Sequence, residues 1–217
     1  MTKPKYKAVI FDFDDTLVET RLIKFKHHKT VAKKFYNIDL TEEIFLEHYG
    51  KPLNTLIKEL YQDSDTLENM VKANVSIRED FLKRVYSESV NVVTKLLNHG
   101  IKVGVLSATN KNFVVDDLNR LNFPVDRMSV VQGADETSVH KPDPDVFISM
   151  FDKLMKQGIK KEDTVYIGDS LSDLQAAHGA GIDFIAVTTG LYTYNDFKKH
   201  GAKLIIKNIK EVLDLVI

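Results

Sequence analysis

The sequence predicts a doubly wound parallel α/β sheet that carries an inserted all-helical domain. Short apolar runs rich in β-branched residues alternate with segments of helical periodicity, and this alternation is typical of parallel strands joined by helical crossovers. One long stretch near the N-terminus breaks the alternation, because it shows helical periodicity and almost no strand-like run. Buried strands are predicted at residues 6–11, 101–106, 128–131, 165–168, 184–187 and 204–206.

The helix after Pro142 has the clearest predicted ends. Asp143 suits the N-cap, Pro144 suits the first helical position, and Gly158 suits the end of the helix. A second helix is predicted at residues 92–98, before Gly100. Apolar side chains after Pro144 recur at helical spacing and predict one buried stripe, made of Val146, Phe147, Met150, Phe151, Leu154 and Met155.

The stretch from residue 20 to residue 87 is predicted to be a helical insert. Its segments at 44–49, 56–61 and 70–85 have helical periodicity, and apolar residues also recur at helical spacing in its first part, at Leu22, Phe25, Ala32, Phe35 and Tyr36. We therefore expect a core domain made of residues 1–19 and 88–217, with residues 20–87 inserted after the first strand.

The composition favours a globular protein that acts on a small molecule. The 217 residues are 43% hydrophobic, which is enough for a sizeable core. Thirty basic residues balance thirty-one acidic ones, so the net charge of −1 argues against a nucleic-acid partner or a membrane partner. No apolar stretch is long enough for a membrane span, the first residues do not form a signal peptide, and a cytoplasmic location is expected. The sequence makes no prediction of oligomeric state.

Reactive polar residues follow four of the predicted strands. In an open parallel sheet, ligands bind at the carboxyl ends of the strands, so these residues are expected to meet in one crevice. They are Asp12, Asp14, Asp15 and Thr16 after the first strand, Ser107 to Asn110 after the second, His140 and Lys141 beyond the third, and Asp169 to Asp173 after the fourth.

The acidic residues in this group predict a divalent cation. Two carboxylates about 4 Å apart repel by about 4 kcal/mol at an effective dielectric near 20, so Asp12, Asp14 and Asp169 require a counter-charge. The chain has no cysteine, and an all-oxygen site favours Mg²⁺, which also binds phosphate. Because Asp12 and Asp14 are two residues apart, one can attack phosphorus while the other serves the leaving oxygen. Lys141 and the Ser107 hydroxyl are candidates to stabilise the phosphate charge.

The order and spacing of these segments resemble the four motifs of the haloacid dehalogenase (HAD) superfamily. The matching strings are Asp12-Phe-Asp14-Asp15-Thr16-Leu17, Leu106-Ser107-Ala108-Thr109-Asn110, Lys141-Pro142 and Gly168-Asp169-Ser170-Leu171-Ser172-Asp173. The helical insert resembles the C1-type cap of the phosphoglycolate phosphatase and β-phosphoglucomutase branch. Asp14 distinguishes the chain from the dehalogenase branch, which lacks an acid at that position. Asp15 stands where the commonest form of the motif has glycine.

The resemblance implies an Mg²⁺-dependent phosphatase that forms an aspartyl-phosphate on Asp12. It implies that Asp14 is the general acid and base, and that a small phosphorylated metabolite is the substrate. The implied phosphate ligands are Ser107, Ala108 and Lys141. The implied metal ligands are Asp12, the Asp14 carbonyl and Asp169. Asp173 is expected to support the metal site without binding the ion directly.

Several alternatives remain open at this stage. Asp173 also fits a helix-capping box with Ser170. Lys51 is a candidate substrate ligand, although Gly50 and Pro52 beside it suit a simple helix end.

Two other functions remain open. A β-phosphoglucomutase-like phosphotransferase would use the same core, and a non-catalytic domain that binds phosphorylated ligands would be expected to lose a motif residue. A basic cluster comprises Lys24, Lys26, His27, His28, Lys29, Lys33 and Lys34. It is interpreted as a solvated helix face, and the alternative is a surface that attracts an anionic substrate.

Overall fold

The computed structural model describes residues 5–217 and divides the chain into two compact units. Among the described residues, one unit comprises residues 5–18 together with Val85–Ile217, and the other is Glu19–Arg84. The boundaries therefore lie at 18/19 and 84/85, where the sequence predicted 19/20 and 87/88. In the described residues, no helix is both long enough and apolar enough to cross a bilayer.

The first unit is built on a parallel sheet, as predicted. The described residues form six strands in the order β5-β4-β1-β6-β7-β8, so β1 and β6 are neighbours in the middle of the sheet. All six predicted strands are present. Their bounds are β1 (Ala8–Asp12), β4 (Lys102–Leu106), β5 (Val130–Gln132), β6 (Thr164–Gly168), β7 (Asp183–Val187) and β8 (Leu204–Ile206).

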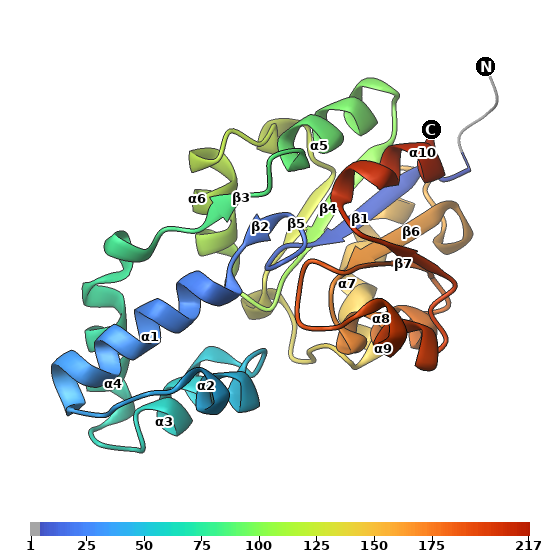
Figure 1. The fold of residues 1–217 in the computed structure, drawn as a ribbon. Coiled ribbons are helices and arrows are strands. Elements are labelled where there is room, and N and C mark those ends of the chain that lie inside the picture. The colour runs from blue at the N-terminus through green and yellow to red at the C-terminus, as the bar shows by residue number, and fades with distance from the viewer. Residues whose placement is uncertain (1–4) are drawn as a thin grey trace. The chain divides into compact units, whose positions relative to one another are not determined.

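Helices cover both faces of this sheet, which makes the unit a three-layer α/β structure (Figure 1). Side chains of β1 alternate between the layers: Val9 and Phe11 join one hydrophobic cluster, and Ala8 and Ile10 join the other. The first face is covered by α5 (Ser89–Asn98), α6 (Lys111–Arg120) and α10 (Val212–Val216), and the second by α7 (Ile148–Met155), α8 (Leu171–Ala180) and α9 (Tyr194–Lys199). The doubly wound fold is thereby confirmed.

The predicted helix ends are correct in type and partly wrong in position. Asp143 is an N-cap whose side chain accepts a hydrogen bond from the Asp145 amide at 2.9 Å, but the first turn is a 3₁₀-helix, η4 (Pro144–Phe147), before α7 begins. Gly158 has a φ of 76°, which favours glycine, three residues after α7 ends. Met155 was predicted to be buried and is 56% exposed, because it lies on the side of α7 that faces away from the sheet. Helix α5 begins at residue 89 rather than 92.

Several short elements were not predicted. Strands β2 (Val18–Glu19) and β3 (Arg84–Val85) pair in a separate two-stranded sheet. Two residues are too few to produce a periodic pattern, so the sequence gives no signal for them. The core unit also contains the 3₁₀ turns η2 (Val125–Arg127), η3 (Ala134–Glu136), η5 (Lys161–Asp163) and η6 (Ile209–Glu211).

The second unit is helical and has a hydrophobic core of its own. The core residues include Val31, Phe45, Ile57, Leu60 and Met70, all of which are almost fully buried. The unit's helices are α1 (Arg21–Tyr36), α2 (Glu42–His48), α3 (Leu53–Leu60), α4 (Leu67–Ser76) and the 3₁₀ turn η1 (Arg78–Phe81).

The interpretation of the basic cluster on α1 as a solvated face was wrong for its two histidines. His27 is 8% exposed and His28 is 2% exposed. The Asn74 amide donates to the Tyr61 hydroxyl at 2.7 Å, and that hydroxyl lies 2.8 Å from His28 Nδ1. Burial lowers the pKa of His28 to about 3, so the ring is neutral and belongs to the interior of this unit. The prediction from charge was wrong here because a neutral histidine packs in a protein interior like other aromatic side chains.

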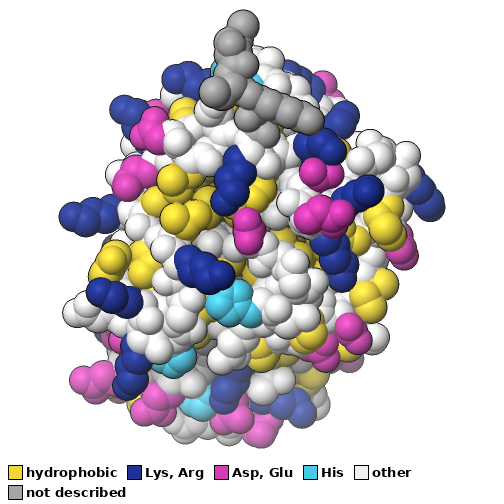
Figure 2. All heavy atoms as spheres, turned by 90° about the vertical axis from the view of Figure 1, so that its right-hand side faces the viewer, with side chains coloured by type: hydrophobic (Ala, Val, Ile, Leu, Met, Phe, Trp, Pro, Cys, Tyr) yellow, Lys and Arg dark blue, Asp and Glu magenta, His cyan; other side chains and the backbone are white. Residues whose placement is uncertain are grey.

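Charged side chains of both signs are intermingled on the face drawn in Figure 2. Lysine and arginine alternate there with aspartate and glutamate around apolar side chains, so this face carries no continuous basic surface. This distribution agrees with the nearly balanced composition.

Candidate active site

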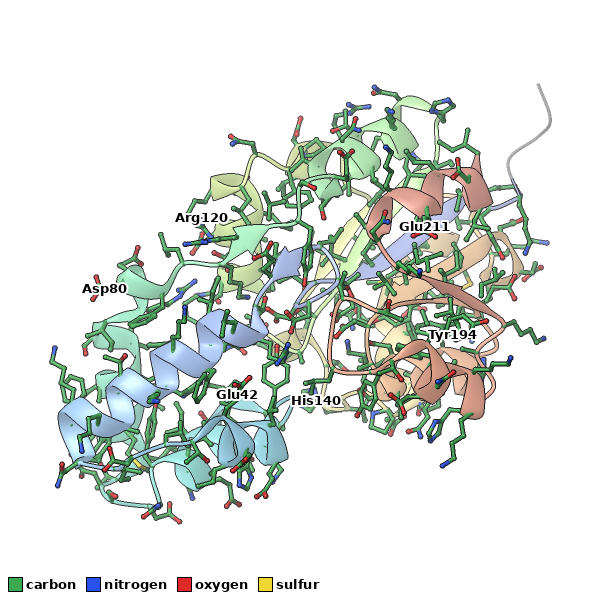
Figure 3. All side chains as sticks on the ribbon, viewed as in Figure 1. Glu42, Asp80, Arg120, His140, Tyr194 and Glu211 are labelled. Carbon is green, nitrogen blue, oxygen red and sulfur yellow. The ribbon has the colours of Figure 1, made fainter. Side chains whose placement is uncertain are left out.

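Three of the predicted site residues meet at the carboxyl end of the sheet. Asp12 is the last residue of β1, and Asp173 lies in the first turn of α8, which follows β6. The Lys141 ammonium donates to Asp12 Oδ1 at 2.6 Å and to Asp173 Oδ1 at 2.6 Å. Its side chain is 10% exposed, so the ion pairs are shielded from water. Lys141 follows His140, which is labelled in Figure 3. The fold thereby joins residues that are 129 positions apart in the sequence.

Asp169 completes a cluster of buried carboxylates. Asp12, Asp169 and Asp173 each offer one oxygen, and these oxygens lie within 4.8 Å of one another. The Thr16 hydroxyl donates to Asp169 Oδ1 at 3.2 Å. A Cβ atom at Gly190 would lie 1.8 Å from Asp169 Oδ2, so only glycine allows the backbone after β7 to approach this carboxylate.

The electrostatics of the cluster favour the binding of a cation. Burial, together with the charges of Asp173 and Asp14, raises the pKa of Asp12 to about 7, against the opposing effect of Lys141. Burial and the charge of Asp12 also raise the pKa of Asp169 well above its ordinary value. Burial opposes the charge of Lys141, but Asp12 and Asp173 raise its pKa well above the usual range. One lysine cannot balance three carboxylates, and an all-oxygen donor set of this kind fits a hard divalent cation.

The second aspartate of the first motif has a different environment from Asp12. The Thr109 hydroxyl, in the loop after β4, donates to Asp14 Oδ2 at 2.8 Å. The Asp14 backbone pairs with Val18 in an isolated bridge, which ties the turn after β1 to its own downstream residues. The Thr109 hydroxyl therefore orients the Asp14 carboxylate, and the bridge to Val18 fixes the turn that carries Asp14.

Asp15 shows why glycine is common at its position in the family motif. Its φ is 57°, in the left-handed region that glycine enters freely and that aspartate tolerates better than most residues. The Thr189 hydroxyl donates to the Asp15 carbonyl, which joins this turn to the segment before Gly190. The departure from glycine is thus compatible with the turn.

Ser107 and Ala108 occupy the loop at the carboxyl end of β4. Ser107 is 3% exposed, its amide donates to the Gln132 carbonyl at 3.0 Å, and its hydroxyl accepts from the Thr109 amide at 3.0 Å. Ala108 is exposed. These contacts hold the loop in a fixed conformation, and the phosphate-binding role of both residues remains a prediction.

Asp173 performs the capping role that the sequence left open. Its Oδ2 accepts from the Ser170 amide at 3.1 Å, and its own amide donates to Ser170 Oγ at 3.1 Å, which completes a capping box. Its Oδ1 accepts from Lys141 and from the Tyr166 hydroxyl. Both carboxylate oxygens are therefore engaged, and Lys141 is the residue through which Asp173 is joined to Asp12.

Lys51 lies in the second unit. It is exposed, and its ammonium lies 2.8 Å from His48 Nδ1. Gly50 has a φ of 91°, and Pro52 is the N-cap of α3, which is the helix-end arrangement that the sequence offered as the simpler interpretation. The proposed contact of Lys51 with substrate remains a prediction.

Sequence reasoning missed the contacts that Thr109 and Tyr166 make in the site. Thr109 was quoted inside a motif without a role, and Tyr166 lies within the apolar run of β6. A tyrosine in a buried strand gives no signal of a polar contact, because its ring alone explains its burial. The proximity of its hydroxyl to Lys141 depends on the tertiary fold.

The comparisons with known proteins agree with this geometry. Residues 9–187 match the family model described as haloacid dehalogenase-like hydrolase. The chain is 26% identical to the phosphorylated carbohydrates phosphatase of Thermotoga maritima (97% of this chain, 98% of the relative) and 25% identical to the pyrophosphatase PpaX of Oceanobacillus iheyensis (97% and 96%). The structure of a predicted phosphoglycolate phosphatase from Haemophilus somnus superposes with a TM-score of 0.83 at 21% identity, over 97% of this chain and 98% of that one. The chain belongs to the haloacid dehalogenase-like hydrolases.

Proposed function

We propose that this hydrolase is an Mg²⁺-dependent phosphatase that cleaves a small phosphomonoester through an aspartyl-phosphate on Asp12. The observation that carries the proposal is the buried contact between Lys141 and Asp12, at the end of a strand and within a cluster of carboxylates. The phosphatase relatives support the reaction class, and they also support a phosphorylated small molecule as substrate.

In the first step, a carboxylate oxygen of Asp12 bonds to phosphorus as the bond from phosphorus to the leaving oxygen breaks. Lys141 holds Asp12 and offers positive charge to the equatorial phosphate oxygens, and the Ser107 hydroxyl and the Ala108 amide donate to the same oxygens. Asp14, oriented by Thr109, gives its proton to the leaving oxygen.

In the second step, Asp14 removes a proton from water, and the water oxygen attacks phosphorus to release phosphate and restore Asp12. The same carboxylate then carries the proton needed for the next turnover. This exchange of roles accounts for the presence of two aspartates with different contacts in one motif.

Asp12, Asp169 and the Asp14 carbonyl are the proposed ligands of the cation. Mg²⁺ supplies charge that offsets the repulsion among the carboxylates and that between Asp12 and the phosphate. The helical second unit is proposed to be the cap whose residues, Lys51 among them, select the substrate.

The substitution Asp12→Asn tests the proposal. It should lower Mg²⁺-dependent hydrolysis of a generic aryl phosphate by about a thousandfold or more, since the amide is a poor nucleophile of similar shape. Asp163→Asn is a matched control, because Asp163 also pairs with a lysine, Lys7, at 2.8 Å but at the amino end of β6. Retention of most activity by Asp12→Asn would refute the nucleophilic role. A panel of phosphorylated metabolites, compared by kcat/KM, then identifies the substrate.

A further inference from the structure

Tyr166 is a buried tyrosine whose hydroxyl lies next to the proposed phosphate-stabilising lysine. It sits on the central strand β6 and has no exposed surface. Its hydroxyl lies 3.2 Å from Lys141 Nζ and 2.8 Å from Asp173 Oδ1. Neither the family motif nor the reaction proposed above uses this residue.

The chemistry of the two neighbours fixes the direction of both hydrogen bonds. An ammonium can only donate, and an ionised carboxylate can only accept. The Tyr166 oxygen therefore accepts from Lys141, and its proton is donated to Asp173. Burial, and the charge of Asp173 next, raise the pKa of Tyr166 well above its ordinary value, which keeps the proton on the hydroxyl.

These contacts account for the three N–H groups of Lys141. In the described part of the chain, the ammonium has acceptors at Asp12 Oδ1, Asp173 Oδ1 and the Tyr166 hydroxyl, at distances of 2.6, 2.6 and 3.2 Å. Two of the acceptors are charged and one is neutral. The neutral acceptor adds direction without adding a further negative charge to a site that already holds an excess of carboxylates.

The aromatic ring is itself fixed by packing, so the hydroxyl is delivered to one point. Tyr166 packs edge-on against Phe147, with the ring centroids 5.0 Å apart and the ring planes at 81°. The centroids of the Tyr166 and Phe184 rings are 6.0 Å apart. Both neighbours are buried in the same hydrophobic cluster. A rigid ring that presents one polar atom is suited to orient a flexible lysine side chain.

We propose that Tyr166 is a positioning residue that holds the Lys141 ammonium against Asp12 by bridging Lys141 and Asp173 with its hydroxyl. The inference rests on the proposed function of this site. Without the hydroxyl, Lys141 would keep its charge and its two carboxylate partners. It would lose the acceptor of its third N–H group, which helps to fix the position of the ammonium. The ammonium would then stabilise the charge of the phosphate less well.

Tyr166→Phe tests the inference because it removes the hydroxyl and keeps the packed ring. It should lower kcat about tenfold, the effect of one hydrogen bond to a charged group, and raise KM several-fold because the bound phosphate also loses part of the stabilisation by Lys141, with little change in the Mg²⁺ concentration for half activation. The matched control is Tyr6→Phe: Tyr6 is 2% exposed and also donates to an aspartate, Asp183, at 2.7 Å, but it precedes the amino end of β1. This control should keep wild-type kcat. A kcat for Tyr166→Phe within twofold of wild type, or an equal loss in Tyr6→Phe, would overturn the proposal.

A double-mutant cycle separates positioning from a structural effect. Tyr166→Phe and Asp173→Asn both act through Lys141, so their effects on kcat should be strongly non-additive, whereas Tyr166→Phe and Tyr6→Phe should combine additively. Additive effects of Tyr166→Phe and Asp173→Asn would contradict a shared action on Lys141.

Calorimetric titration with inorganic phosphate in the presence of MgCl₂ gives a readout that does not depend on turnover. Tyr166→Phe should bind phosphate several-fold more weakly than wild type and Tyr6→Phe, and equal binding by all three would overturn the inference. A wild-type protein that binds phosphate but hydrolyses no ester would instead count against the proposed function alone.

Discussion

Lys141 carries the positive charge that pairs with two buried carboxylates of the site. Its two carboxylate partners hold it in the charged form although its side chain is nearly buried. Removal of one partner would leave a buried cation poorly balanced, and removal of the lysine would leave Asp12 and Asp173 to repel each other. A single side chain thus offsets the repulsion between Asp12 at the end of β1 and Asp173 in the first turn of α8.

Thr109 gives a prediction at the residue scale. Thr109→Val removes the hydroxyl that donates to Asp14 Oδ2 and keeps the volume of the side chain. We expect kcat to fall about tenfold, because Asp14 loses the hydrogen bond that orients it for the proposed proton transfer. Steady-state kinetics would measure the change. Thr109→Ser restores a hydroxyl and should recover most of the activity, so an inactive serine variant would argue that the methyl group, not the hydroxyl, is what matters.

At the scale of elements, the first turn of α8 combines helix capping with support of the site. Ser170 and Asp173 cap each other, and Asp173 also accepts from Lys141. Helix α9 has a similar capping box, made by Thr193 and Asp196, at an exposed position. The two helices therefore separate the contribution of a cap to stability from its contribution to the site.

Ser170→Ala and Thr193→Ala should both lower the free energy of unfolding by about 1 kcal/mol, the usual effect of losing an N-cap side chain. Only Ser170→Ala should also lower kcat, because it loosens the carboxylate that holds Lys141. Urea unfolding and kinetics on both variants check this expectation. Equal kcat values would mean that Asp173 keeps its position without the cap.

At the scale of the whole molecule, the carboxylate cluster links stability to pH and to metal. The folded pKa of Asp12 is raised above its unfolded value, so the folded state binds this proton more tightly. The stabilisation from Asp12 in the metal-free protein is therefore present at low pH and is lost as pH rises from about 4 to about 7. Asp169, whose pKa is also raised, acts in the same direction.

Mg²⁺ should consequently stabilise the protein more at pH 8 than at pH 5.5. At pH 5.5 the cation must displace protons from Asp12 and Asp169, and at pH 8 it relieves the repulsion between their charges. Thermal unfolding with MgCl₂ and with EDTA at both pH values measures the difference in Tm, and Asp169→Asn should reduce it. A shift in Tm that is independent of pH would show that the cation binds elsewhere.

The strands and the motif residues could be predicted from the sequence because their signals are local. An apolar run such as residues 101–106 and a strand-end aspartate such as Asp12 are recognisable within a few positions of the chain. Helix caps at Asp143 and Ser170 were visible for the same reason. The exposure of Met155 and the burial of His28 were not, because the side of a helix that packs depends on what lies against it.

By itself, the sequence determined the order of strands and helices, the helical character of residues 20–87 and the resemblance to the haloacid dehalogenase-like family. These properties follow from periodicity and motif spacing, which are written along the chain. Only the tertiary structure decided that Tyr166 contacts Lys141, that Thr109 orients Asp14 and that the capping residue Asp173 also accepts from Lys141. Each of these contacts joins residues from different elements, and their distances are set by how the sheet and helices pack rather than by any local preference.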